Sequence, residues 1–266
     1  MLQKELISRV KEKGIETPGI DAIMMYGSFT HGCGDNFSDI EFYIFIDDEV
    51  YKEFNSKEWV SSISPFYTSF YNEFGTEVFI FKTLIRGEFH FLAVKEMPII
   101  ETFVTVGYFP DTEAMCLYDR NGRLQAHLNV LKGHTVKRET PENIESVINN
   151  CINSILFGIN VLKRGEIARS LECLWFAQKY YLQLVRILEG TTEHWVNPTK
   201  YLEKEISAAS YQVYKNCTSN LDTDNLCSAY KNLLSAAQNT ATNLSSKYKF
   251  HYEHELFQLL SDYIDK

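Results

Sequence analysis

The sequence changes character near residue 135, and this change constrains the fold more than any other feature. Before it, short runs rich in β-branched and aromatic residues alternate with Gly, Asp, Asn and Ser, which is typical of strands joined by turns. These runs span residues 20–25, 40–46, 77–81, 89–94 and 114–118. After it, apolar residues recur with helical spacing. We therefore expect an α+β chain in which residues 1–135 form an α/β domain and residues 136–266 form an all-α helical bundle.

The second half carries recognisable helix boundaries. Thr140 suits the N-cap of a helix and Pro141 its first position, so a helix is predicted over residues 140–162. A second predicted helix, over residues 166–189, ends at Gly190. Further helices are predicted over residues 199–206, 223–247 and 254–263.

The charge balance argues against nucleic acid as the main partner. The chain has 26 Lys and Arg residues against 35 Asp and Glu residues, a formal net charge of −9 and an isoelectric point near 5.3. Proteins whose affinity comes from neutralising a phosphate backbone normally carry a basic surface. We therefore expect a small-molecule partner.

Cysteine usage and hydropathy predict a cytoplasmic protein without a membrane span. The six cysteines are scattered and form no C-x-x-C pair, which is typical of reduced thiols. The N-terminal residues place Leu2, Leu6 and Val10 at four-residue spacing among charges, which indicates an amphipathic helix rather than a signal peptide. The longest uncharged stretch, residues 146–162, contains four asparagines and is therefore no candidate for crossing a bilayer.

The segment over residues 24–46 carries the clearest chemistry. Gly27 allows a sharp turn and close approach of a ligand, and Ser28 adds a hydroxyl group and backbone N–H groups that can hold phosphate oxygens. Asp39 and Glu41 are two residues apart at the start of an apolar run, so on a strand both carboxylates project from one face. A magnesium ion would relieve their mutual repulsion. The alternative is that both are solvent-side residues of an edge strand.

A third carboxylate is expected from a neighbouring strand. Strand alternation puts Glu88 and His90 on one face, so Glu88 is the preferred candidate and Glu77 is its rival. Two cations held by three carboxylates could clamp the attacking and leaving oxygens of a phosphoryl displacement. The residues therefore predict nucleotidyl transfer.

Several stretches resemble a known family. Gly-Ser followed after ten residues by Asp-x-Glu is similar to the signature of the polymerase-beta-like nucleotidyltransferase superfamily. The chain resembles more closely the lincosamide nucleotidyltransferases of the enterococcal two-domain type, along nearly its whole length. This resemblance is carried by MMYGSFT (24–30), SDIEFYIF (38–45), NEFGTEV (72–78), LIRGEFHF (84–91), GINVLKRGE (158–166) and ARSLE (168–172).

The resemblance implies an antibiotic-resistance enzyme. Its expected fold is a polymerase-beta-like catalytic domain with a mixed sheet, followed by a helical domain, in a homodimer. Its expected activity is the magnesium-dependent transfer of AMP from ATP to a hydroxyl group of lincomycin or clindamycin, with release of pyrophosphate. The family's metal-binding and catalytic carboxylates fall on Asp39, Glu41 and Glu88, with Glu88 a candidate general base. Its triphosphate-binding Gly-Ser falls on Gly27 and Ser28.

Four further residues are weaker candidates. Lys163 and Arg169 lie where one predicted helix ends and the next begins, and are assigned either to the triphosphate or to a solvated corner between helices. His90 is a candidate for orienting the acceptor, and Tyr43 for lining its pocket. A structural role in the core is the alternative for both. The aromatic residues Phe66, Tyr67, Phe70 and Tyr71 are assigned to the core by default, although one or two could wall the acceptor pocket.

Two other functions remain open at this point. One is a nucleotidyltransferase with a different acceptor, either an aminoglycoside or a protein side chain. The other is an inactive nucleotidyltransferase fold used for nucleotide sensing or protein binding. The intact set of Asp39, Glu41 and Glu88 argues against the second, because a non-enzyme has no physical reason to gather three acids on one face.

Overall fold

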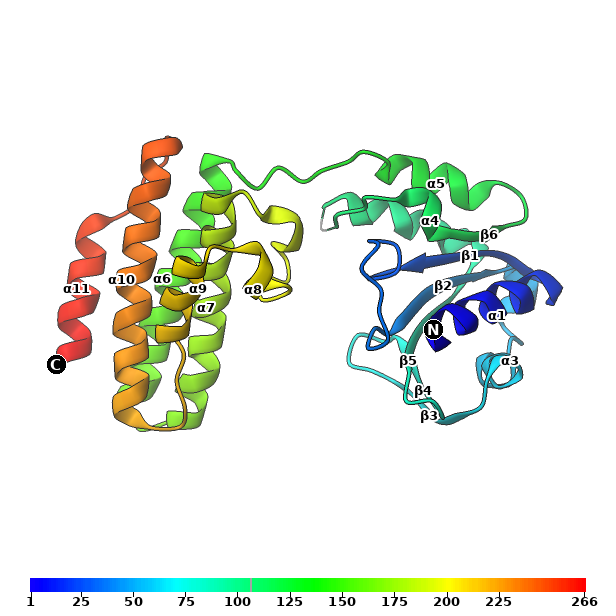
Figure 1. Ribbon diagram of the computed structural model, residues 1–266, viewed down its shortest axis with the longest axis horizontal. Helices are drawn as coiled ribbons and strands as arrows, with labels where there is room; N and C mark the ends of the chain where they lie inside the picture. Colours follow the sequence, from blue (N-terminus) through cyan, green and yellow to red (C-terminus); the bar gives the residue numbers. More distant parts are fainter. Residues whose placement is uncertain (106) are drawn as a thin grey trace. The chain divides into compact units, whose positions relative to one another are not determined.

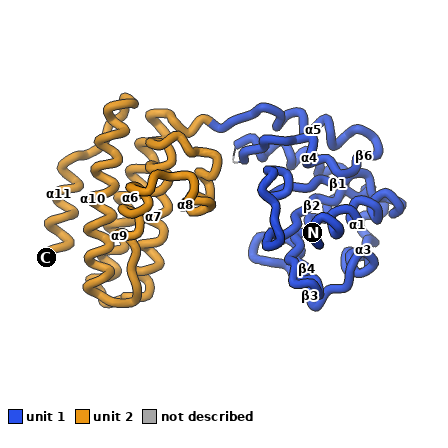
Figure 2. Tube along the Cα trace, viewed as in Figure 1, with its two compact units in different colours: residues 1–136 blue, residues 137–266 orange. Residues whose placement is uncertain are grey.

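The computed structural model describes residues 1–105 and 107–266 and consists of two compact units, Met1–Val136 and Lys137–Lys266 (Figures 1 and 2). The first unit is built around a mixed β-sheet and the second consists of helices. The predicted α+β architecture is therefore confirmed. The two units are described separately below.

The sheet of the first unit has β2 near its centre. Among the described residues the sheet contains six strands in the order β3-β4-β5-β2-β1-β6. Strand β2 pairs with β5 in parallel, and the other neighbouring strands are antiparallel. The strands are β1 (Ile20–Tyr26), β2 (Ile40–Ile46), β3 (Phe66–Tyr71), β4 (Glu77–Phe81), β5 (Arg86–Ala93) and β6 (Cys116–Asp119). Because β2 has a partner on each side, the edge-strand alternative for Asp39 and Glu41 is wrong.

Helices cover both faces of this sheet (Figure 1). One face packs its alternate apolar side chains, such as Phe42 and Phe89, against α1 (Leu2–Glu16) and α3 (Ser56–Ile63). The other face, which includes Met24 and Phe45, packs against a second set of elements. That set comprises the 3-10 helix η1 (Val94–Thr105), α4 (Thr112–Met115) and α5 (Arg123–Leu131), while the short α2 (Asp48–Tyr51) follows β2.

The second unit is a bundle whose helices begin and end largely as predicted. The Thr140 hydroxyl accepts a hydrogen bond from Asn143 N at 3.2 Å and caps α6, and Gly190 ends α7 with a φ of +72°. The predicted helix over residues 199–206 is shorter, and α9 was not predicted. The elements are α6 (Pro141–Lys163), α7 (Ile167–Glu189), η2 (Thr192–His194), α8 (Leu202–Glu205), α9 (Ala208–Asn216), α10 (Thr223–Lys247) and α11 (His254–Asp265).

A buried arginine organises the irregular segment after α7. The Arg186 side chain is fully buried, and its nitrogens donate to the carbonyl oxygens of Thr191, Pro198 and Lys200 at 2.6 to 2.9 Å. It also contacts the Glu205 carboxylate at 2.7 Å. Because every partner is in place, this buried charge is satisfied and fixes the path of the chain from α7 to α8.

The aromatic residues of β3 correct one prediction. Tyr67, Phe70 and Tyr71 were assigned to the core by default, but they are 68%, 48% and 68% exposed. The reason is that β3 is the outermost strand, and its side chains pack mainly against β4 alone. Phe66, which was assigned with them, packs against Phe79 at a ring distance of 5.0 Å.

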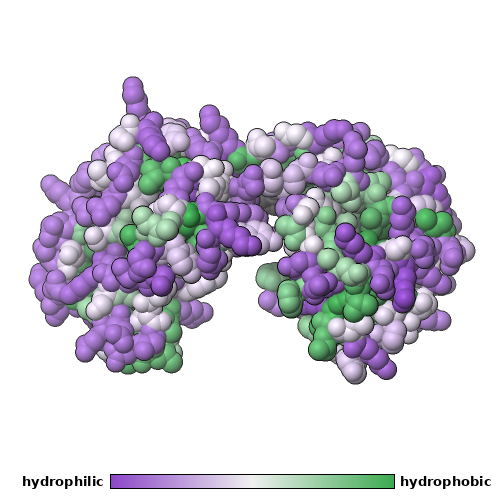
Figure 3. All heavy atoms as spheres, viewed as in Figure 1, coloured by the Kyte–Doolittle hydropathy of each residue, from purple (hydrophilic) through white to green (hydrophobic). Residues whose placement is uncertain are grey.

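The surface is largely hydrophilic on the visible face, with smaller hydrophobic groups between polar side chains (Figure 3). In the part of the chain that the structure describes, no helix combines the length and apolar character needed to cross a bilayer. The six cysteines are free thiols. The cytoplasmic location stays a prediction.

Candidate active site

Strand pairing brings the predicted carboxylates to one edge of one sheet face. In the parallel pair of β2 and β5, Glu41 lies opposite Glu88, and in the antiparallel pair of β1 and β2 it lies opposite Tyr26. Asp39 comes directly before β2, two residues from Glu41, and so adjoins the same face. We refer to Asp39, Glu41 and Glu88 as the carboxylate cluster.

Gly27 allows the Glu41 carboxylate to lie against the backbone of the turn after β1. Gly27 has a φ of +79°, and a Cβ atom added there would lie 1.5 Å from Glu41 Oε2. The Gly27 carbonyl accepts hydrogen bonds from Thr30 N at 3.1 Å and from Thr30 Oγ1 at 2.9 Å, which closes the turn. Ser28 follows, and its carbonyl accepts a hydrogen bond from Cys33 N at 3.1 Å. Gly27 thus adjoins the carboxylate cluster, and Ser28 is the next residue of the same turn.

Arg86 bridges two members of the cluster. Its Nη1 lies 2.8 Å from Asp39 Oδ2, and its Nη2 forms an ion pair with Glu88 Oε1. Burial lowers the pKa of Arg86, but Glu88 and Asp39 more than compensate, so that the pKa is raised. Arg86 thus pairs with two acids in this structure.

Tyr26 contacts both Glu88 and His90 on the same face. Its hydroxyl group lies 3.4 Å from Glu88 Oε2 and 3.1 Å from His90 Nε2. Burial and the charges of Glu41 and Glu88 raise the pKa of Tyr26, so the hydroxyl keeps its proton. Tyr26 was not among the predicted site residues, since its contact with Glu88, 62 residues along the chain, depends on strand order.

His90 and Tyr43 form a stacked pair beside the cluster. Their rings are 4.1 Å apart at an angle of 5°, as expected for residues opposite one another on β5 and β2. Burial lowers the pKa of His90, although the charge of Glu88 acts in the other direction. Burial and Glu88 together raise the pKa of Tyr43 to about 12. The pair is close to Glu88, and its predicted role toward an acceptor stays a prediction.

Glu77, the rival of Glu88, faces the other side of the sheet. It lies opposite Phe89 on β5 and opposite Tyr71 on β3. Glu77 lines a cavity of about 440 Å³ with Tyr51, Phe54 and other residues. Strand alternation therefore separates Glu77 from the carboxylate cluster.

The chemistry of the cluster suits a hard divalent cation. Carboxylate oxygens are the protein ligands that Mg²⁺ prefers, often with substrate phosphates completing its coordination. Within residues 1–105 and 107–266, however, no three His, Cys, Asp or Glu side chains are arranged to hold a metal ion as they stand. The guanidinium group of Arg86 lies between Asp39 and Glu88 instead. The donor set fits the ion, and Arg86 supplies the positive charge in this structure.

Lys163 and Arg169 belong to the second unit. The Lys163 ammonium lies 5.0 Å from the centre of the Tyr263 ring. Arg169 pairs with Glu166 at 3.1 Å and lies 5.5 Å from the centre of the Phe157 ring. These contacts fit cations at a helix corner, and the assignment of both residues to the nucleotide stays a prediction.

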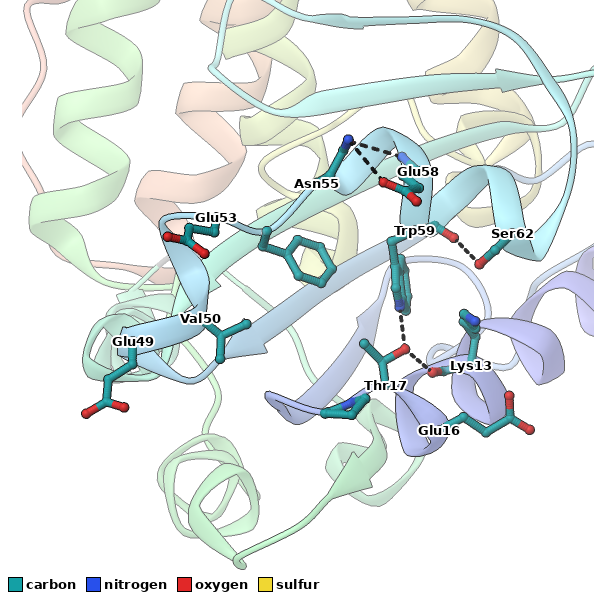
Figure 4. A pocket seen from close by; sticks show the side chains of 12 residues that line it. Lys13, Glu16, Thr17, Glu49, Val50, Glu53, Asn55, Glu58, Trp59 and Ser62 are labelled. Carbon is teal, nitrogen blue, oxygen red and sulfur yellow. Dashed lines mark hydrogen bonds between the residues drawn. The ribbon is translucent and has the colours of Figure 1, made fainter.

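A separate pocket of about 670 Å³ lies beside α1 and α3 (Figure 4). Trp59 Nε1 donates to Thr17 Oγ1 at 2.9 Å across it, and Asn55 Oδ1 accepts from Glu58 N at 3.2 Å. These helices cover the sheet face opposite the carboxylate cluster. The pocket is therefore not part of the candidate active site.

A comparison with known protein families agrees with the resemblance seen in the sequence, over the second unit of the chain. Residues 140–263 match the family described as "Lincosamide nucleotidyltransferase-like, C-terminal domain". An aminoglycoside 6-adenyltransferase from Bacillus subtilis is similar in structure with 11% identity and a TM-score of 0.46, over 99% of this chain and 96% of that chain. A nucleotidyltransferase-like protein from Exiguobacterium sibiricum 255-15 follows with 12% identity and a TM-score of 0.35, over 98% and 88% of the two chains. No curated protein matches the chain significantly. Residues 140–263 are therefore similar to the C-terminal domain of that family, as the sequence resemblance predicted for this part of the chain.

Proposed function

We propose that this chain, a nucleotidyltransferase whose residues 140–263 form a lincosamide nucleotidyltransferase-like C-terminal domain, transfers AMP from ATP to a hydroxyl group of a lincosamide antibiotic. Magnesium is the proposed cofactor and pyrophosphate the second product. The observation that supports the proposal best is the position of Glu41, which lies opposite Glu88 and directly against Gly27. Acids beside a phosphate-binding turn are what nucleotidyl transfer requires.

Each residue of the cluster receives a role from its position. Asp39 and Glu41 would hold Mg²⁺, and the Gly27–Ser28 turn would hold the triphosphate with its backbone N–H groups. When bound, the ion would neutralise phosphate charge and polarise the phosphorus centre that is attacked. Because Glu41 touches the turn, the ion ligands and the phosphate-binding backbone adjoin each other.

Glu88 is the proposed general base. It accepts the proton of the acceptor hydroxyl as that oxygen bonds to the α-phosphorus of ATP. The bond between the α-phosphorus and the oxygen bridging to the β-phosphorus breaks, and pyrophosphate leaves. Tyr26, which contacts Glu88 Oε2 at 3.4 Å, orients the carboxylate.

The assignment is tested by replacing each carboxylate with its amide. We expect Asp39→Asn, Glu41→Gln and Glu88→Gln each to slow pyrophosphate release with Mg-ATP and clindamycin by about a hundredfold or more, as the loss of a general base or metal ligand does. Glu113→Gln is the matched control, because Glu113 is an exposed acid of the same unit whose carboxylate pairs with Lys132. Unchanged turnover in the three folded variants would overturn the assignment.

The acceptor is tested separately with a panel of lincosamides and aminoglycosides. We expect a mass gain of one AMP on lincomycin and clindamycin. A gain on aminoglycosides alone would replace the proposed acceptor while keeping the reaction. The predicted homodimer stays a prediction, tested by the molecular mass in solution.

A further inference from the structure

We propose that Arg86 is an exchangeable counter-ion of the carboxylate cluster. Its guanidinium group holds Asp39 and Glu88 together while no metal ion is bound, and it transfers to phosphate oxygens of the nucleotide when a divalent cation takes its place. The inference rests on the proposed function, because it names how the metal-binding acids are kept together before the metal and nucleotide arrive.

The register of β2 and β5 puts Arg86 where it can serve two carboxylates at once. Ile40 lies opposite Gly87 and Glu41 opposite Glu88, so Asp39 and Arg86 occupy the next step along the parallel pair. Arg86 and Glu88 are two residues apart on β5 and share a face. One guanidinium nitrogen then contacts Asp39 and the other contacts Glu88.

Arg86 contacts carboxylate oxygens that the proposed function assigns to the metal ion and to the proton of the acceptor. Arg86 takes Glu88 Oε1 and Tyr26 approaches Glu88 Oε2, so both oxygens of the proposed base have partners in this structure. Asp39 Oδ2 is likewise taken by Arg86. A metal ion at Asp39 Oδ2, or a proton arriving at Glu88 Oε1, therefore competes with Arg86 for the same atom.

The ion pairs of Arg86 are partly exposed, unlike the contacts of the buried Arg186. The Arg86 side chain is 41% exposed and the Asp39 side chain is 34% exposed, so the ion pair can open without disturbing the core. Arg186, by contrast, is fully buried and donates to three backbone carbonyls. The planar fork of a guanidinium group matches a phosphate as well as it matches carboxylates. Arg86 thus has a second partner once ATP is present.

The test measures binding of Mn²⁺ to the full-length, nucleotide-free protein by electron paramagnetic resonance of the free ion. We expect Arg86→Gln to raise the Mn²⁺ affinity about tenfold, because two partly exposed ion pairs no longer compete with the metal. Arg86→Lys keeps the charge but loses the fork, so its affinity should fall between those of the wild type and the Gln variant. Lys132→Gln, which removes an exposed positive charge of the same unit, should leave the affinity unchanged.

The second readout is nucleotide binding. We expect Arg86→Gln to weaken the binding of Mg-ATP severalfold and Arg86→Lys to restore part of it, since a lysine can also reach a phosphate. An Mn²⁺ affinity that is unchanged or lower in Arg86→Gln would overturn the inference and make Arg86 a fixed structural partner of the acids.

This outcome is distinguishable from failure of the proposed function. Metal titration needs neither an acceptor nor turnover, so the order of Mn²⁺ affinities among the variants reports on Arg86 even if the acceptor is wrong. Conversely, loss of AMP transfer in Glu41→Gln together with unchanged Mn²⁺ affinity in Arg86→Gln would keep the function and reject the exchange.

Discussion

At the scale of one residue, Gly27 allows the turn after β1 to contact the carboxylate cluster. Its positive φ is one that L side chains adopt at a cost, and its missing side chain leaves room for the Glu41 carboxylate. Gly32, in the same loop, also has a positive φ of +71° but has no atom within 4 Å of an added Cβ. A comparison of alanine variants at the two glycines therefore separates the effect of backbone strain from the effect of the close contact with Glu41.

Gly27→Ala is expected to abolish AMP transfer, while Gly32→Ala keeps most of it. Both variants should lose roughly 1 to 3 kcal/mol of unfolding free energy from the positive φ. Only Gly27→Ala should also displace Glu41 and so weaken metal and nucleotide binding. Urea unfolding and pyrophosphate release measure the two effects. Equal activity in the two variants would contradict the proposed role of the Gly27 contact.

Much of the candidate site follows from sequence spacing, and the rest depends on strand order. Asp39 and Glu41 are assigned by alternation along one strand, and Gly27 by its turn chemistry. Which acid joins them depends on how β5 pairs, and single-sequence alternation left Glu77 as a rival of Glu88. The contacts of Tyr26 and Arg86 with Glu88 depend on the same pairing, which no local pattern specifies.

At the scale of secondary-structure elements, Gly158 shows how closely the helices of the second unit pack. It lies within α6 at a position where an added Cβ would lie 1.9 Å from the Tyr230 hydroxyl of α10. Tyr230 is fully buried, and its hydroxyl donates to the Ser170 carbonyl of α7 at 2.7 Å. One small residue therefore sets the spacing of three helices.

Gly158→Ala is expected to destabilise the protein. In the interior of an ordinary helix, replacing glycine with alanine would instead stabilise the helix by about 1 kcal/mol. Overpacking against Tyr230 should outweigh this gain and lower the unfolding free energy by about 1 to 3 kcal/mol. Urea unfolding followed by circular dichroism measures the change. In a Tyr230→Phe background the cost of Gly158→Ala should shrink, because the closest atom is gone. A variant more stable than the wild type would show that the helices can separate freely.

The elements were predictable where local signals are strong. The Thr140 cap and Gly190 mark α6 and α7, and the apolar run of β2 marks a central strand. The edge strand β3 was missed because its exposed aromatics resemble core residues in a single sequence. The helix predicted over residues 199–206 is longer than α8, because the chain before α8 follows a path that Arg186 fixes through backbone carbonyls rather than a helical one.

At the scale of the whole molecule, each of the two units has its own apolar core. Buried apolar clusters of the first unit use residues up to Leu131, and the cluster of the second unit starts at Ile144. The stretch between α5 and α6 has no regular structure, and Lys132 and Lys137 are exposed in it. Each unit thus buries its own apolar surface, which is the main source of folding free energy.

Brief treatment of the native protein with trypsin is therefore expected to cut first between α5 and α6. Cleavage after Lys132 or Lys137 should yield two fragments that resist further digestion, because each retains its core while the exposed connecting backbone can enter the protease. Mass spectrometry identifies the cut, and circular dichroism of the separated fragment containing residues 138–266 should show a cooperative helical unfolding transition. Replacing Lys132 and Lys137 with Gln should slow the first cut without changing thermal stability, since both side chains are exposed. If both fragments are instead degraded as fast as the intact chain, each unit depends on the other for its stability.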